Sequence, residues 1–190
     1  VDLIDTLIWH HDGPFGDSSA IPTYIVSELT RRHVTVVLNG DGGDEVFAGY
    51  RRFQASVWSE KIPAWARGLA ETLLARVPGS ASGRDRLALA RRFASAARLP
   101  LDERITRWSS IFYDGLEQLL LPDLMPPSFD RLRYLGGHRD QLERRSALGR
   151  VLHINYSTYL LNDLLVKMDR CAMANSLEAR SPFLDTALVE

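Results

Sequence analysis

Apolar residues recur mostly at helical spacing along this chain. Four of them in residues 1–9 follow the i, i+3, i+4 spacing of an amphipathic helix: Leu3, Ile4, Leu7 and Ile8. Residues 10–19 are polar and punctuated by glycine and proline, which predicts a loop. A second helix is expected over residues 21–32, with Ser18 or Ser19 able to cap its start.

One short stretch has the pattern of a buried strand, the β-branched apolar run at residues 34–38. Gly40 breaks this run, and glycines follow at positions 42 and 43. Asp44 and Glu45 fit the first turn of a helix, because the helix dipole favours acidic side chains there. A strand, a glycine-rich turn and a helix start together form a geometry in which main-chain N–H groups commonly bind nucleotide phosphates.

From residue 51 onward the pattern predicts helices and no convincing strand. Four segments have the periodicity of helices: 64–77, 84–97, 102–113 and 116–121. Prolines at positions 122, 126 and 127 break this series. The longest helical signal covers residues 140–161, and Asn162-Asp163 is expected to interrupt it before a further segment at 164–170.

Composition narrows the class of protein. With 45% hydrophobic and 25% charged residues and a formal net charge of −1, the chain has neither the basic balance of a nucleic-acid binder nor an acidic tail. No apolar run reaches the roughly 18 residues of a membrane span. The single cysteine, Cys171, excludes an internal disulfide and fits a reducing cytoplasm. We therefore expect a cytoplasmic protein with no nucleic-acid or membrane partner.

Three carboxylates lie close together in the glycine-rich turn: Asp41, Asp44 and Glu45. Their mutual repulsion is costly unless a cation lies among them. Mg²⁺ is bound by one or two carboxylates together with substrate phosphate oxygens, which suits this turn. The alternative is a tight turn whose acids cap the helix and face water.

Two other groups of residues suggest metal or nucleotide chemistry less strongly. His10 and His11 adjoin a loop with two aspartates, but adjacent histidines point apart, so a solvated loop is favoured over a metal site. Residues 42–46 nearly match the Gly-Gly-Asp-Glu-Phe signature of nucleotide cyclases that make cyclic dinucleotides. That signature requires a second strand directly afterwards, and residues 47–53 lack a strand pattern.

Residues 164–185 carry alternating acids and bases on an otherwise apolar stretch. Lys167 and Arg170 are followed by Glu178 and Arg180, close to the helix-breaking Pro182. Charges with this spacing usually pair in a partly buried site.

Residues 38–50 and 164–185, in this order, resemble the synthetase domain of glutamine-hydrolysing asparagine synthetases. Residues 9–22 are similar to the bacterial branch of that family, and the resemblance covers essentially the whole chain. The chain starts at Val1 inside a predicted helix and also ends within a pattern, so we expect a truncated piece of a longer protein. In the family, a Ser-Gly-Gly-x-Asp-Ser pyrophosphate loop and an N-terminal glutaminase cysteine lie upstream, which implies that this piece alone is inactive.

The resemblance implies an α/β fold, a doubly wound Rossmann-like ATP-pyrophosphatase domain of the adenine nucleotide alpha hydrolase-like type. This part of the domain is expected to be mostly α-helical with few strands. Residues 1–60 would belong to the nucleotide-binding core, residues 61–161 to a helical elaboration, and residues 162–190 to helices near the active site.

The resemblance also implies a reaction and its participants. The side-chain carboxylate of aspartate attacks ATP to give β-aspartyl-AMP and pyrophosphate, with Mg²⁺ as cofactor, and ammonia derived from glutamine then displaces AMP. An N-terminal glutaminase domain in the parent chain would supply the ammonia. The resemblance leaves open whether the protein forms a homodimer. The alternatives are a related amidotransferase with another acceptor acid, as in surface-polysaccharide clusters or β-lactam synthetase, and a non-catalytic nucleotide-binding descendant.

Residue roles follow from the resemblance position by position. Asp44 would ligate the metal, and Asp41 would lie near the substrate amino group. Lys167 and Arg170 match positions around the activating lysine of the family, and either of them could reach the phosphates. ATP and pyrophosphate would be bound by Asn39, Gly40, Gly42, Gly43 and Tyr50. Structural or substrate support would come from Glu45, Glu178 and Arg180.

Two positions depart from the family pattern. Asn39 stands where serine is usual, which is expected to alter hydrogen bonding on the adenine side. Gly13 replaces a common acid in the upstream loop.

Overall fold

A computed structural model describes residues 2–13, 15–76, 86–109, 121, 123 and 142–190. The chain divides into two compact units, one formed by Val1–Gly49 and Asn155–Glu190, the other by Tyr50–Ile154. The predicted loop at 78–83 and the predicted helix at 116–121, apart from Leu121, lie outside the described residues.

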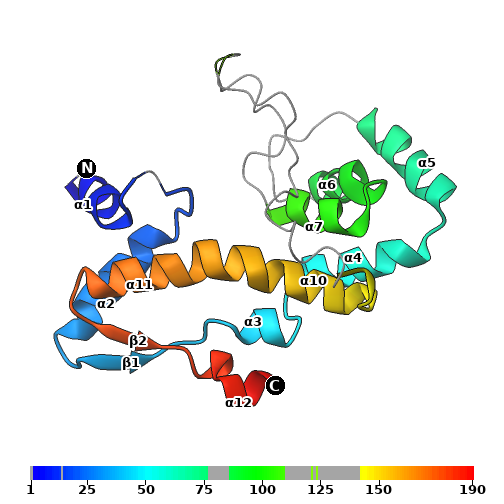
Figure 1. The fold of residues 1–190 in the computed structure, drawn as a ribbon. Coiled ribbons are helices and arrows are strands. Elements are labelled where there is room, and N and C mark those ends of the chain that lie inside the picture. Colours follow the sequence, from blue (N-terminus) through cyan, green and yellow to red (C-terminus); the bar gives the residue numbers. More distant parts are fainter. Residues whose placement is uncertain (1, 14, 77–85, 110–120, 122, 124–141) are drawn as a thin grey trace. The chain divides into compact units, whose positions relative to one another are not determined.

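The first unit contains a pair of parallel strands, β1 (Val36–Leu38) and β2 (Glu178–Arg180). Val36, Val37 and Leu38 pair with Glu178, Ala179 and Arg180 in turn, and Figure 1 shows the two strands side by side. The strand predicted at 34–38 is confirmed in a shorter form. β2 was not predicted, because three residues with charged ends have no strand pattern of their own and depend on pairing with β1.

Three helices form the small core of the first unit. These are α1 (Asp2–His11), α2 (Ala20–Arg31) and α11 (Leu165–Met173), and α11 packs against both of the others. Leu7, Ala20 and Cys171 are buried between them. The helical predictions for these segments are confirmed.

The two adjacent histidines do not lie in a loop as predicted, because α1 continues through them. His11 Nδ1 lies 2.8 Å from the carbonyl oxygen of Leu7, and its ring centroid lies 4.4 Å from that of Phe15. The helix therefore ends two residues beyond the predicted range of 1–9.

The long helical signal is confirmed only in part. α10 (Ala147–Asn155) begins after Ser146, whose Oγ accepts a hydrogen bond from the N–H of Gly149 at 3.1 Å. A π-helix, η3 (Tyr156–Leu164), follows and leads directly into α11. The predicted interruption at Asn162-Asp163 is therefore wrong, since wider helical turns absorb these polar residues. π-Helical segments occur frequently at functional sites.

The glycine-rich turn leads into a single helical turn, α3 (Gly43–Val46), which packs against the short 3-10 helix η4 (Pro182–Leu184). The helix ends where Ala48 adopts a left-handed conformation with φ of 58°. A last helix, α12 (Thr186–Val189), is capped by Asp185, whose carboxylate accepts from the N–H of Ala187 at 3.0 Å.

The described part of the second unit is helical. It contains α4 (Arg51–Lys61), α5 (Ala64–Ala75), α6 (Arg86–Ala97), α7 (Leu101–Ser109) and most of α10. The helices predicted over 64–77, 84–97 and 102–113 are confirmed within the described residues, and residues 77, 84–85 and 110–113 lie outside them. The helix α4 after the glycine-rich turn excludes the hairpin that the nucleotide-cyclase signature requires.

A buried arginine joins three segments of this second unit. The side chain of Arg104 is 0% exposed, and its Nη1 donates to the carbonyl of Ser56, to the hydroxyl of Ser59 and to Glu60. Its Nη2 donates to the carbonyl of Leu99 at 2.7 Å. Burial lowers the pKa of Arg104, and the carboxylate of Glu60 opposes that shift.

The described residues are mostly helical, as predicted, and contain two short parallel strands, of which only β1 was predicted. The doubly wound arrangement and the proposed division at residues 60 and 161 stay predictions. None of the helices in the described part of the chain is long and apolar enough to cross a membrane.

Candidate functional site

The carboxyl ends of β1 and β2 meet in a hydrogen-bonded cluster. Ser181, just after β2, donates its hydroxyl to Asn39 Oδ1 at 2.7 Å, and the N–H of Asn39 donates to the carbonyl of Arg180 at 2.9 Å. Asn39 Nδ2 also donates to Asp41 Oδ2 at 3.2 Å, and Asn39 Oδ1 accepts from the N–H of Asp41 at 3.2 Å. In open parallel sheets, ligands bind outside this end of the strands.

The three glycines of the turn have different surroundings. Gly42 has φ of 90°, and a Cβ there would overlap the side chain of Leu184. A Cβ on Gly43 would lie 3.4 Å from the ring of Phe183. Nothing lies within 4 Å of the equivalent point on Gly40. Close packing against η4 thus explains Gly42, and Gly40 is the position of the turn that is open to a ligand.

The three carboxylates of the turn do not gather around one point. Asp44 is exposed, Asp41 is half-buried, and the side chain of Glu45 lies in the interior with 3% exposure. No group of three or more His, Cys, Asp or Glu residues in the described ranges could hold a metal ion. The expectation that all three acids crowd around a cation is therefore wrong, because the helical turn α3 directs Glu45 inward and Asp44 outward.

Asp41 has a protein cation nearby. Burial raises the pKa of Asp41, the positive charge of Lys167 opposes this, and the negative charge of Glu45 adds to it. Lys167 lies on α11, so that helix contributes charge to the turn after β1. Asp41 and Lys167, each predicted as a site residue, thus belong to one electrostatic cluster.

Lys167 is held by the loop that precedes α2. Its Nζ donates to Asp17 Oδ2 at 2.6 Å and to Ser19 Oγ at 2.7 Å. Burial by itself would raise the pKa of Asp17, but the hydrogen bonds from Lys167 and Ser19 outweigh it and hold the pKa below its ordinary value. Sequence reasoning did not identify Asp17 and Ser19 as site residues. The local sequence Gly-Asp-Ser-Ser predicts a loop, but it does not indicate that the loop contacts Lys167, about 150 residues further along the chain.

Ser19 does not cap α2 through its side chain, contrary to expectation. Its hydroxyl instead donates to Asp17 Oδ2 at 2.7 Å and accepts from Lys167. The side chain therefore serves the charged cluster rather than the helix start.

Two further groups surround the charged pair. Burial raises the pKa of Asp163 on η3, the negative charge of Asp17 adds to this, and Lys167 opposes it. Burial also raises the pKa of the Cys171 thiol to about 11. Asp163 is therefore a third carboxylate near Lys167, besides Asp17 and Asp41. The sequence indicated only that Asp163 would interrupt a helix.

The remaining predicted site residues lie apart from this cluster. Arg170 is exposed on α11. Arg180 Nη2 pairs with Glu178 Oε1 at 2.7 Å, but the two side chains are 64% and 54% exposed, so the expectation of a partly buried pair is wrong. Tyr50 begins the second unit, where the guanidinium carbon of Arg52 lies 3.9 Å from its ring centroid.

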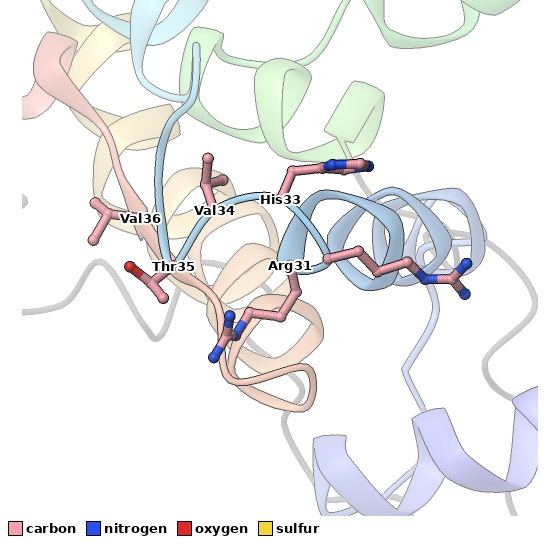
Figure 2. A pocket seen from close by; sticks show the side chains of 6 residues that line it. Arg31, His33, Val34, Thr35 and Val36 are labelled. Carbon is pink, nitrogen blue, oxygen red and sulfur yellow. The ribbon is translucent and has the colours of Figure 1, made fainter.

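A surface hollow lies at the opposite, amino-terminal end of β1. Its lining residues run from the end of α2 into the strand: Arg31, Arg32, His33, Val34, Thr35 and Val36. Figure 2 shows the side chains of Arg31 and His33 pointing away from each other, so they do not converge on a ligand. This hollow therefore offers no convergent set of side chains, unlike the cluster at the carboxyl ends of the strands.

Parallel strands with a glycine-rich turn and charged side chains at their carboxyl ends place the chain among α/β proteins. More narrowly, the chain belongs to the asparagine synthase family, whose sequence profile matches residues 1–190.

Three relatives illustrate this similarity. The chain is 30% identical over 190 residues to glutamine-hydrolyzing asparagine synthetase 1 of Bacillus subtilis (strain 168), covering 97% of this chain and 28% of that protein. It is 29% identical over 188 residues to a protein described as an asparagine synthetase in Mycobacterium tuberculosis (strain ATCC 25618 / H37Rv), with the same coverage. An asparagine synthetase described in Methanocaldococcus jannaschii is 65% identical over 49 residues, which are 26% of this chain and 10% of that protein.

The chain thus spans about 28% of the length of the first two of these curated relatives. No solved structure matches it.

Proposed function

We propose that this chain carries part of the synthetase site of an ATP-dependent amide ligase that converts aspartate to asparagine. The β-carboxylate of aspartate attacks the α-phosphorus of ATP, and the bond to the β-phosphate breaks, which releases pyrophosphate. Ammonia, derived from glutamine in a glutaminase domain of the parent chain, then attacks the acyl carbon of β-aspartyl-AMP and AMP leaves. The family match over residues 1–190 is the observation that carries this proposal.

Three residues of the cluster take the central roles in this proposal. Asp41 attracts the amino group of the substrate. Lys167 compensates the negative charge that develops when the carboxylate meets the triphosphate, since a fixed ammonium in a site with little water stabilises such charge. The open main chain at Gly40 lets a phosphate approach the turn. The electrostatic proximity of Asp41 and Lys167 supports this assignment over one that uses the exposed Arg170.

The other predicted residues keep supporting roles. Asn39 orients Asp41 through their hydrogen bonds, and Gly42 and Gly43 shape the phosphate-binding turn. Tyr50 is proposed to contact ATP, and Glu45, Glu178 and Arg180 to support the strands and the turn. These assignments rest on the family pattern.

Magnesium is the implied cofactor, and the described residues offer it one exposed carboxylate rather than a complete set of ligands. Mg²⁺ keeps several waters and binds through one or two carboxylates plus substrate phosphates. The exposed carboxylate of Asp44 suits one such ligand. When bound, the metal would neutralise charge on pyrophosphate.

A product analysis on the full-length protein tests this function. The protein is incubated with ATP, aspartate and ammonium or glutamine, and pyrophosphate, AMP and asparagine are quantified. We expect the three products in equal amounts and a strict dependence on aspartate. Pyrophosphate release that depends on a different acid would indicate a related amidotransferase, and ATP binding without turnover would indicate a non-catalytic descendant. Either result would contradict the proposal.

A further inference from the structure

The side chain of Lys167 is held unusually firmly for a lysine. Two of its three N–H bonds are used, by Asp17 Oδ2 at 2.6 Å and Ser19 Oγ at 2.7 Å. The Lys167 side chain is 11% exposed and that of Asp17 is 20% exposed. A free lysine side chain samples many rotamers, so two short bonds in a poorly hydrated place fix the position of the ammonium.

The residues that hold Lys167 are themselves fixed. Asp17 Oδ1 accepts from the N–H of Ser19 at 2.8 Å, and its Oδ2 accepts from the hydroxyl of Ser19 at 2.7 Å. The next residue, Ala20, lies in the core beside Cys171, whose Sγ donates to the carbonyl of Ala20 at 3.5 Å. Cys171 is one helical turn beyond Lys167 on α11, so the loop and the helix are joined both at the ion pair and in the core.

Further charge around the ammonium favours a defined position for it. Asp41 and Asp163 both interact electrostatically with Lys167, from the turn after β1 and from η3. An ammonium surrounded by three carboxylates could move toward any of them. The two direct bonds from the 17–19 loop select one position.

We propose that Asp17 and Ser19 are positioning residues for Lys167, which hold two of its N–H bonds and leave the third for an oxygen of the substrate. This inference rests on the proposed ligase function for the identity of that substrate oxygen. The positioning itself depends only on the contacts of Asp17, Ser19 and Lys167. The competing explanation is that the ion pair serves only to attach the loop to α11.

A chemical readout tests the positioning without any need for turnover. The full-length protein is treated with limiting acetic anhydride, and acetylation of Lys167 is followed by mass spectrometry. Asp17→Asn should raise the rate of Lys167 acetylation about tenfold, because the charged hydrogen bond that restrains the amine is lost. Ser19→Ala should raise it by a smaller factor. Glu28→Gln, which removes an exposed pair with Arg32 on α2, is the matched control and should leave the rate unchanged.

Kinetics then separate positioning from simple attachment. For pyrophosphate release, Asp17→Asn should lower kcat about tenfold or more while KM for ATP changes less than about threefold, since a displaced but intact lysine acts mainly on the transition state. A purely structural role would lower the thermal midpoint with kcat per folded molecule unchanged.

Failure of the positioning proposal can be told apart from failure of folding and from failure of the ligase proposal. If Asp17→Asn does not fold, Ser19→Ala answers the same question with a smaller change. If the wild type makes no pyrophosphate, the ligase proposal fails, while acetylation still tests whether Asp17 and Ser19 restrain the amine of Lys167. Unchanged acetylation of Lys167 in folded Asp17→Asn and Ser19→Ala would overturn the inference.

Discussion

The ammonium of Lys167 lies 2.6 Å from a carboxylate oxygen of Asp17, although 150 residues separate them in the sequence. This contact joins the loop before α2 to α11. Because Lys167 also influences Asp41 after β1, the geometry of the candidate site depends on three distant segments of the chain.

Acid should weaken the Asp17–Lys167 pair in a defined window. The pKa of Asp17 is lowered in the folded protein, so the unfolded chain takes up its proton first as the pH falls. The stability that the pair contributes is therefore fully present well above pH 3.8 and is lost as the pH falls below that value. Urea unfolding of wild type and Asp17→Asn across this range should show a stability difference that shrinks with acid. A difference that grows with acid would contradict the pKa shift.

Alanine substitutions at Gly42 and Gly40 should affect different properties, protein stability at Gly42 and ATP binding at Gly40. Gly42→Ala should lower the free energy of unfolding by about 1–3 kcal/mol, because φ of 90° disfavours alanine and its Cβ would overlap Leu184. Gly40→Ala meets no atom within 4 Å and should leave stability within about 0.5 kcal/mol. It should instead weaken ATP binding, if phosphate approaches the open main chain there. Urea unfolding and nucleotide titration measure the two effects, and similar behaviour of both variants would disprove the distinction.

Asp44 is the residue on which the metal assignment depends. Asp44→Asn should lower amide synthesis about 100-fold, because charge on the leaving pyrophosphate loses a metal ligand. Folding should be unaffected, since Asp44 is exposed, and glutamine hydrolysis elsewhere in the parent chain should survive. If Asp44 only favours the start of α3, asparagine will replace it well and synthesis will barely change. Rates of synthesis and of glutamine hydrolysis on this variant decide between the two roles.

Arg104 should be a main determinant of stability in the second unit. Arg104→Met leaves the carbonyls of Ser56 and Leu99 without their buried donor, which should cost about 3 kcal/mol. Hydrogen exchange should show lost protection in α4 and α7. The partner variant Glu60→Gln, at a side chain that is 38% exposed, should cost about 1 kcal/mol or less. Equal losses in the two variants would show that the ion pair, rather than the carbonyl contacts, stabilises this unit.

The sequence predicted those parts of the fold that depend on local periodicity. The helices containing Leu7, Ile25 and Ile105 follow from apolar spacing, and the strand at Val37 from its β-branched run. The strand at Ala179 could not be predicted, because it exists only through pairing with β1. A break was predicted at Asn162-Asp163 because two polar residues in a helical pattern usually end a helix. The chain stays helical there as part of η3, which the sequence alone did not indicate.

The candidate site was predictable in its residue types but not in its contacts. Asp41 and Lys167 were identified from the family pattern, whereas the pairing of Lys167 with Asp17 requires the packing of α11 against α2. The crowding of three acids in the turn was a reasonable reading of their spacing. It failed because neighbouring positions in the helical turn α3 face different surroundings: the side chain of Glu45 is buried, whereas that of Asp44 is exposed.

Isotope transfer during turnover tests the central claim most directly. Aspartate carrying ¹⁸O in its β-carboxylate is supplied to the full-length protein with ATP and a nitrogen donor, and the AMP formed is analysed by mass spectrometry. If the carboxylate attacks the α-phosphorus, its bridging oxygen leaves with AMP, so each AMP should carry one ¹⁸O. Unlabelled AMP, or formation of ADP and labelled phosphate, would contradict the proposed ligase function.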